Sequence, residues 1–170
     1  MKNIVLIGMP GVGKSTIGVI LAKEIGYRFL DSDLLIQERE GKLLKDIIAE
    51  QGIDGFLQVE NEVNKSIQTK KTVIATGGSV VYGEEAMEHL KKIATIVYLS
   101  CPYDRLTRRL GDLKGRGVVL REGQTLRTIY EERCALYEKY AEVTAESGGG
   151  SMEETVADIV EKMEELHKSL

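Results

Sequence analysis

Short apolar runs alternate along this chain with segments in which apolar residues recur every three or four positions. The apolar runs occupy residues 3–7, 28–30, 72–76 and 94–99, and a shorter one begins at Val143. Runs of this length between turn residues are typical of buried strands, whereas the longer spacing is typical of helices that pack along one face. The alternation predicts an α/β fold of three layers (α/β/α), in which helices cover both faces of a central five-stranded parallel sheet.

The same spacing predicts where the helices lie. They are expected near residues 17–25, 34–40, 44–48, 56–67, 84–90, 102–110, 125–140 and 151–170. Gly52 and Gly55 are expected to bracket a turn between two of these helices, and Gly41 to end another. Ser151, with Glu154 three residues later, is typical of a capped helix start.

Residues 8–15 read Gly-Met-Pro-Gly-Val-Gly-Lys-Ser, which matches the phosphate-binding pattern G-x-x-x-x-G-K-[ST]. A predicted strand precedes this segment and a predicted helix follows it, as that pattern requires. Glycines let backbone N–H groups approach phosphates, Lys14 would meet the β- and γ-phosphates, and the Ser15 hydroxyl would bind Mg²⁺. The residues expected to hold a nucleoside triphosphate are Gly11, Val12, Gly13, Lys14, Ser15 and Thr16. The alternative is an ordinary glycine turn before a helix.

Length, composition and charge exclude several kinds of partner. The chain has 170 residues, 42% hydrophobic and 29% charged, which fits one globular domain over residues 1–170. A net charge of −4 provides no basic field for nucleic acid, and no apolar run is long enough to cross a membrane. Cys101 and Cys134 match no metal-binding or redox spacing, so we expect free thiols and a reducing, cytoplasmic location.

Two more segments are expected beside the phosphate loop, because ligands of open α/β sheets bind beyond the carboxyl ends of the strands. Asp31 and Asp33 follow the second strand. One could reach Mg²⁺ through water, and the other could orient a substrate hydroxyl or accept its proton. Gly77 and Gly78 follow the third strand and would let the backbone approach a small ligand closely. The alternatives are that Asp33 only caps the next helix and that the glycines form an ordinary turn.

Residues 111–124 interrupt the helix and strand pattern with four glycines and three basic residues, which predicts a mobile lid. Phosphoryl transfer spreads negative charge over the γ-phosphate, so a cation from a lid is expected, and Arg116 is the best candidate. The alternative for Arg116 is a solvated loop charge. Arg133 lies in the next helix near Glu131 and Glu132, so surface pairing is an alternative to a binding role.

The order of these motifs resembles that of the shikimate kinases, small P-loop kinases similar to the nucleoside monophosphate kinases. The matching features are the phosphate loop, Asp31-x-Asp33, Gly55-Phe56 with Glu60, Gly77-Gly78, Arg116, and Arg133 before Leu136-Tyr137. The resemblance spans nearly the whole chain. It implies an ATP- and Mg²⁺-dependent kinase that phosphorylates a ring hydroxyl of shikimate to give shikimate 3-phosphate, a step in aromatic amino-acid biosynthesis.

The resemblance also implies roles for individual residues. Ser15 and Asp31 would serve the metal, and Asp33 would hold the acceptor hydroxyl and assist its deprotonation. Arg116 would close over the phosphates, and Arg133 would bind the shikimate carboxylate. The catalytic residues would then be Lys14, Asp33 and Arg116. The remaining implied contacts are those of the acceptor with Gly77 and Gly78, and those of the adenine with Arg109 and residues 146–151.

Two positions depart from the pattern of the shikimate kinases. Leu57 stands where the family has an arginine that shares the substrate carboxylate, and Ser79 stands where it has a third glycine. Losing one partner of a buried charged hydrogen bond costs about 2–5 kcal/mol, so a shikimate kinase would need a replacement. Lys45 or Lys65 could supply a charge, and Gln58 a neutral hydrogen bond. Otherwise the acceptor is another small hydroxylated metabolite.

Other functional classes fit less well. A non-catalytic nucleotide-binding module would not need the catalytic residues, all of which are present. Residues 64–67 read Asn-Lys-Ser-Ile and lack the aspartate with which GTPases read guanine. The strand that ends at Thr76 lacks the acidic pair of AAA motors. The expectation is an enzyme that acts on a small molecule and, by analogy with its architecture, works as a monomer.

Overall fold

Five parallel strands form one sheet in the order β2-β3-β1-β4-β5. The computed structural model describes residues 2–112 and 120–169, and its strands are β1 (Asn3–Ile7), β2 (Arg28–Asp31), β3 (Thr72–Ala75), β4 (Ala94–Ser100) and β5 (Val143–Glu146). The central strand β1 pairs with β3 and with β4, so that Val5 lies between Ile74 and Ile96. The predicted five-stranded parallel sheet is confirmed.

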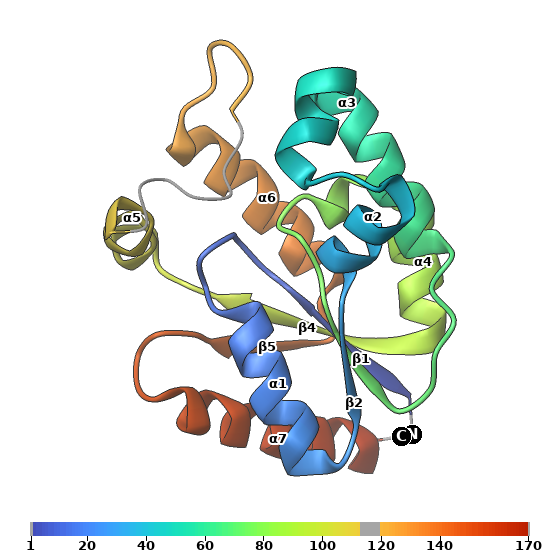
Figure 1. Ribbon diagram of the computed structural model, residues 1–170. Coiled ribbons are helices and arrows are strands. Elements are labelled where there is room, and N and C mark those ends of the chain that lie inside the picture. Colours follow the sequence, from blue (N-terminus) through green and yellow to red (C-terminus); the bar gives the residue numbers. More distant parts are fainter. Residues whose placement is uncertain (1, 113–119, 170) are drawn as a thin grey trace.

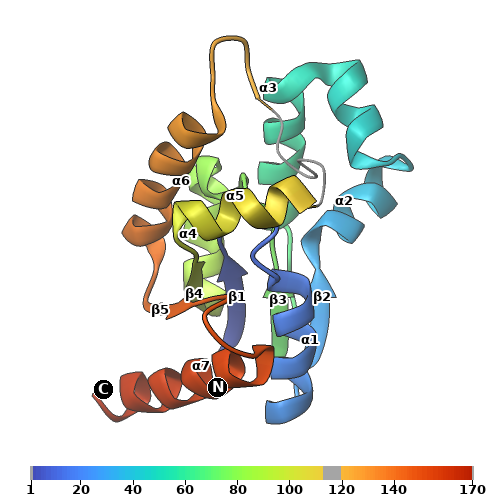
Figure 2. The same cartoon turned by 90° about the vertical axis from the view of Figure 1, so that its left-hand side faces the viewer.

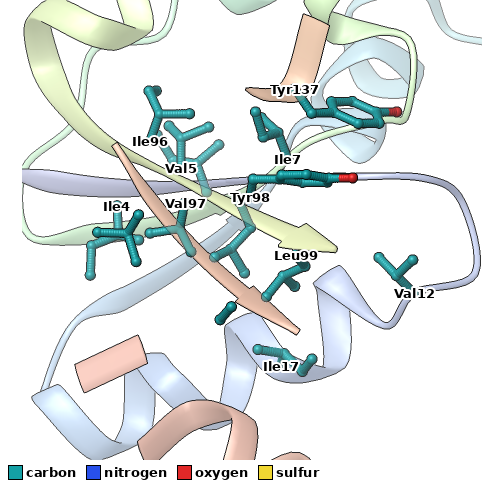
Figure 3. Close-up of a cluster of buried hydrophobic side chains, with 14 of the residues drawn as sticks. Ile4, Val5, Ile7, Val12, Ile17, Ile96, Val97, Tyr98, Leu99 and Tyr137 are labelled. Carbon is teal, nitrogen blue, oxygen red and sulfur yellow. The ribbon is translucent and has the colours of Figure 1, made fainter. Parts of the chain in front are cut away.

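The hydrophobic core lies against both faces of the central strands. All five residues of β1 are buried, and so are six of the seven in β4. A parallel strand that is covered on both faces has to be apolar throughout, which explains the continuous apolar runs in the sequence. Figure 3 shows Ile17 of the first helix on one side of these strands and Tyr137 on the other. Each fully buried side chain of this size stabilises the fold by about 1.5–3 kcal/mol.

The helices form a layer on each face of the sheet (Figures 1 and 2). Their bounds are α1 (Lys14–Ile25), α2 (Ser32–Glu40), α3 (Leu44–Lys65), α4 (Glu84–Ile93), α5 (Tyr103–Asp112), α6 (Leu126–Tyr140) and α7 (Met152–Lys168), with a short 3₁₀ helix at Val80–Tyr82. Helices α1 and α7 pack against each other on one face, and α4 and α6 lie on the other. The predicted three-layer α/β/α arrangement is therefore confirmed.

Helices α2, α3 and α5 lie beyond the carboxyl ends of the strands (Figure 2). Helix α3 contacts both α2 and α4. It therefore connects the helices at this end of the molecule to the layer that contains α4 and α6. In the part of the chain that the structure describes, no helix is both long enough and apolar enough to cross a membrane.

Two element predictions need correction. The turn expected between Gly52 and Gly55 is a break at one residue: α3 continues through both, and only Gly52 leaves helical geometry, with φ 76° and ψ 177°. The loop expected from residue 111 starts later, because α5 continues to Asp112. Residues 113–119 lie outside the described part of the chain, so the lid stays a prediction.

Candidate active site

The three candidate segments meet at the carboxyl edge of β2, β3 and β1, which are neighbours in the sheet. Residues 8–13 follow β1, Asp31 ends β2, and residues 76–79 follow β3. A Cβ atom added at Gly78 would lie 2.6 Å from Pro10 Cδ, and one at Gly77 would lie 2.9 Å from Asp33 Oδ1. The third segment is therefore in contact with the other two, and one small volume can hold groups from all three strands.

The phosphate loop has the backbone geometry that its glycines allow. Gly11 and Gly13 adopt φ of 85° and 95°, in the region that L side chains rarely enter. Gly13 directly precedes α1, so the amino end of that helix lies at the loop. Its backbone N–H groups and its dipole favour negative charge there. This geometry suits a bound phosphate.

Lys14 is buried at the base of the loop. Its Nζ donates hydrogen bonds to the carbonyl oxygens of Gly8 at 2.7 Å and Met9 at 2.9 Å. Burial lowers the pKa of Lys14 to about 8, although the nearby carboxylates of Asp33 and Asp31 favour the charged form. At neutral pH the ammonium is still mostly charged, which is the state that a phosphate requires.

Ser15 and Asp31 form the candidate metal position. The Ser15 hydroxyl donates to Asp31 Oδ2 at 3.2 Å, and Asp31 Oδ1 accepts from the backbone N–H of Asp33 at 2.9 Å. Asp31 is thus the N-cap of α2, and the alternative that Asp33 fills this role is wrong. A hydroxyl and one carboxylate fit Mg²⁺, which usually takes few protein ligands together with phosphates and waters.

A cavity of about 600 Å³ opens next to these groups, between α2, α3, α6 and the residues after β3. Its apolar wall comes from Leu43, Leu44, Ile48, Ile53, Phe56 and Leu57. Its polar lining consists of Asp33, Gln37, Lys45, Glu60, Gly77, Gly78, Ser79 and Arg133. Two acids and two cations therefore line one small cavity. We call this cavity the acceptor pocket.

Asp33 and Glu60 are the acids of the acceptor pocket. Burial raises the pKa of Asp33, and the neighbouring Asp31 carboxylate raises it further. Glu60 is 2% exposed, and its Oε1 accepts from the Ser79 hydroxyl at 2.6 Å. Its Oε2 has no hydrogen-bond partner among the described residues. Burial raises the pKa of Glu60 to about 7.

Glu60 is part of the family resemblance but is not among the site residues predicted from the sequence. A signal was present, because Glu60 follows Phe56 by four positions and precedes Val63 by three. It therefore falls on the apolar face of its helix, where an acid is costly unless something pairs with it.

Arg133 is the deeply buried cation of the acceptor pocket, with 7% of its surface exposed. It lies on the buried face of α6, four positions after Ile129 and four before Tyr137. The expected alternative of surface pairing is wrong, since Glu131 pairs with Arg127 and Glu132 accepts from Tyr82. Arg133 Nε has no partner among the described residues, so this donor is free for a ligand.

The glycines after β3 bring backbone and side chains unusually close together. A Cβ at Gly78 would also lie 3.0 Å from Arg133 Nη1, and the Tyr137 hydroxyl donates to the Gly78 carbonyl at 2.5 Å. A Cβ at Gly77 would lie 2.9 Å from Glu60 Oε2. A side chain at either glycine would have to displace these neighbours, so the close contacts depend on glycine.

The structure separates the three candidates for replacing the missing arginine. Leu57 is part of the apolar wall, and Lys45 lines the same pocket. Lys65 instead pairs with Glu85 at 2.9 Å, on the side of α3 that contacts α4. Gln58 is exposed and does not line the pocket. Only Lys45 remains as a candidate.

Arg109 lies between the phosphate loop and the residues before α7. Its Nη2 is 4.0 Å from a Cβ built at Gly13, and its Nη1 is 3.5 Å from one built at Gly148. The Ser147 hydroxyl donates to the Val12 carbonyl at 2.5 Å and holds that loop against the phosphate loop. Arg116 lies outside the described residues, so its role stays a prediction.

Comparison with known proteins points to one family. The shikimate kinase family model matches residues 10–164. A shikimate kinase of Thermodesulfovibrio yellowstonii is 36% identical over 98% of this chain and 97% of its own length. One of Bacillus cytotoxicus is 34% identical over 96% of this chain and 99% of its own. The structure of a shikimate kinase from Acinetobacter baumannii in complex with shikimate superposes with a TM-score of 0.85, at 32% identity, covering 96% of this chain and 93% of that one. The chain belongs to the shikimate kinase family.

Proposed function

We propose that this chain transfers the γ-phosphoryl group of ATP to a hydroxyl of shikimate. The observation that carries this proposal is a pair of buried side-chain atoms in the acceptor pocket that have no hydrogen-bond partner among the described residues. They are Oε2 of Glu60, which can accept a hydrogen bond, and Nε of Arg133, which can donate one. A ligand that satisfies both must offer a hydrogen-bond donor to Glu60 and an acceptor to Arg133, and a hydroxyl and a carboxylate meet these needs. Shikimate is a ring triol with one carboxylate, and the family to which the chain belongs supports this choice over another hydroxylated metabolite.

In the proposed reaction Asp33 holds the acceptor hydroxyl. The hydroxyl oxygen attacks the γ-phosphorus, the bond from that phosphorus to the oxygen bridging to the β-phosphate breaks, and the hydroxyl proton passes to the Asp33 carboxylate. Lys14 exchanges its bonds to the Gly8 and Met9 carbonyls for bonds to the phosphates. Residues 11–16 hold the phosphates, and Arg109 lies along the adenine. Arg116 would neutralise charge that develops on the transferred group.

Mg²⁺ would be held by Ser15 and Asp31 and would neutralise phosphate charge. These two side chains already share a hydrogen bond, so they lie close enough to serve one ion. Neither lines the acceptor pocket. The metal and the acceptor would thus use different carboxylates, Asp31 and Asp33.

The substrate carboxylate would bind between Arg133 and Lys45, with Gly77 and Gly78 against the ring. Lys42 and Lys65 both pair with glutamates, whereas no carboxylate of the described residues lies within 4.0 Å of the Lys45 ammonium. Because the wall between these groups is apolar, a charge at Lys45 acts more strongly on a bound carboxylate than it would in open water. Lys45 would thereby fulfil the role that Leu57 cannot.

The test is ADP release from Mg-ATP by the purified protein, with and without shikimate. We expect release that depends on shikimate at submillimolar concentration, and phosphorus NMR of the product should show a phosphate monoester. ATP hydrolysis that ignores shikimate would reject this acceptor while retaining the nucleotide site. A screen of other polyols and hydroxy acids would then identify the acceptor.

We further propose that the enzyme is one catalytic domain closed by a lid within residues 111–124, and that it acts as a cytoplasmic monomer. The monomer follows by analogy with other enzymes of this architecture. The two cysteines, Cys101 and Cys134, are both free, which fits a reducing compartment. Light scattering of the purified protein would test the oligomeric state.

A further inference from the structure

Within residues 2–112 and 120–169, the Ser79 side chain makes one hydrogen bond, to Glu60. The residue ends the glycine segment after β3, whereas Glu60 lies in the second half of α3. The Ser79 hydroxyl donates to Glu60 Oε1 at 2.6 Å, the short distance typical of a bond to a charged acceptor. The bond therefore connects two elements that both line the acceptor pocket.

This bond satisfies only one of the two Glu60 oxygens. Oε2 is buried, has no partner among the described residues, and lies 2.9 Å from the position of a Cβ on Gly77. The same Cβ position is 2.9 Å from Asp33 Oδ1. Both carboxylates thus approach the backbone of Gly77 at the polar end of the pocket. A buried acceptor without a partner costs about 1–3 kcal/mol, so its persistence calls for a ligand.

We propose that Ser79 is a positioning residue: its hydroxyl fixes the Glu60 side chain so that Oε2 accepts a hydrogen bond from an acceptor hydroxyl that is not phosphorylated. This inference rests on the proposed function, in which Asp33 takes the reacting hydroxyl. The two acids then bind two different hydroxyls of the ring and set its orientation. A glycine at position 79 could not make this bond.

The charges around Glu60 decide at which pH this arrangement forms. Asp33 of α2 opposes ionisation of Glu60, as burial does, whereas Ser79, Arg133 of α6 and Lys14 of α1 favour it. The ionised carboxylate is the form that accepts from both Ser79 and the substrate. Substrate binding is therefore expected to weaken as the pH falls through about 7, and removing the Ser79 bond should move this transition to higher pH.

The experiment compares S79A with S79T, which keeps a hydroxyl, by measuring kcat and both KM values from pH 5.5 to 9. For S79A we expect the KM for shikimate to rise about fivefold at pH 7, with kcat and the KM for ATP within about twofold. The midpoint of the acidic limb of kcat/KM for shikimate should move to higher pH. S79T should restore that midpoint, and E60Q should remove the part of the limb that protonation of Glu60 causes.

A matched control is S66A, which removes another hydroxyl bond of α3, to the Val63 carbonyl, outside the pocket. It should leave the kinetic constants and the pH profile as in the parent. An unmoved midpoint in S79A, or a parallel loss of kcat and of affinity for ATP, would overturn the inference while leaving the kinase intact. A parent enzyme that ignores shikimate would overturn the proposed function and this inference together.

Discussion

Asp31 and Asp33 lie two residues apart, yet their surroundings differ. Asp31 is held by the Ser15 hydroxyl and by the N–H of Asp33, whereas Asp33 lines the acceptor pocket and has a raised pKa because it is buried. A carboxylate without strong partners and with a raised pKa is suited to accept a proton. Asp31 is therefore suited to serve the metal, and Asp33 is suited to accept the proton of the reacting hydroxyl.

D33N should lower kcat by about 10²–10⁴-fold, the usual contribution of a positioned base, with ATP binding retained. D31N keeps an oxygen that can cap α2, so the fold should remain. Its effect should be on the metal, raising the Mg²⁺ concentration for half-maximal rate by about 10–100-fold. The measurement is a Mg²⁺ titration of both variants. Equal responses of the two would contradict the division of roles.

Lys45 provides a second residue-scale prediction. K45M keeps much of the side-chain volume and removes the charge, so the KM for shikimate should rise about tenfold, with kcat and the KM for ATP nearly constant. Because Lys45 is exposed, added salt should weaken the contribution of its charge and so reduce this difference. K65M is the matched control, since its ammonium pairs with Glu85 outside the pocket. The same increase in both variants would exclude a local role for Lys45.

At the scale of elements, the break in α3 places its two halves around the apolar wall of the pocket. Gly52 adopts φ 76° and ψ 177°, a combination that is essentially confined to glycine. G52A should therefore lower the free energy of unfolding by about 1–3 kcal/mol through the backbone alone, because a Cβ there would meet no atom within 4 Å. Urea unfolding monitored by circular dichroism measures this change.

Substitution by asparagine distinguishes the break at Gly52 from the ordinary helix end at Gly41. Gly41 has φ 67° and ψ 25°, the left-handed region that asparagine tolerates. G41N should therefore cost less than about 1 kcal/mol, whereas G52N should be as destabilising as G52A. Comparable stability of G52N and G41N would show that the backbone at Gly52 can relax.

Elements were predictable from the sequence because their signals are local. The strands, the phosphate loop and the apolar faces each follow from spacing within about ten residues. Side-chain placement was not, as Lys45 and Lys65 show: both are lysines on α3, but Lys45 lines the pocket, whereas Lys65 ends the helix and pairs with Glu85 of α4. Arg133 is intermediate, since the apolar residues four positions before and after it could have indicated burial.

At the scale of the whole molecule, the sheet order brings the chemistry of distant segments together. β3 lies between β1 and β2, so the residues that follow it contact both the phosphate loop and the acids after β2. Buried charge accumulates at this edge, with Lys14, Glu60 and Arg133 each less than 10% exposed. A site of this kind costs stability in the absence of ligands. The pH dependence of folding should reveal that cost.

Glu60 allows this cost to be measured. Its pKa is about 7 in the folded protein, against 4.5 for an ordinary glutamate, so between these values the folded state binds more protons than the unfolded state. The free energy of unfolding therefore falls as the pH rises from 4.5 through 7, by about 3 kcal/mol in total for this group. E60Q does not titrate and lacks this decrease. The free energy of unfolding of E60Q, relative to that of the parent, should therefore rise by up to about 3 kcal/mol between pH 5 and pH 8.

Urea unfolding of E60Q and the parent at pH 5, 6, 7 and 8 measures this difference, and other groups that titrate in both proteins cancel. E24Q is a control for replacing a glutamate by glutamine, because Glu24 is exposed and lies outside the acceptor pocket. A difference between E60Q and the parent that stays constant with pH would mean that Glu60 ionises as easily in the fold as in water. Saturating shikimate should reduce the pH-dependent gain of E60Q, because the ligand supplies the hydrogen bond that the buried carboxylate lacks.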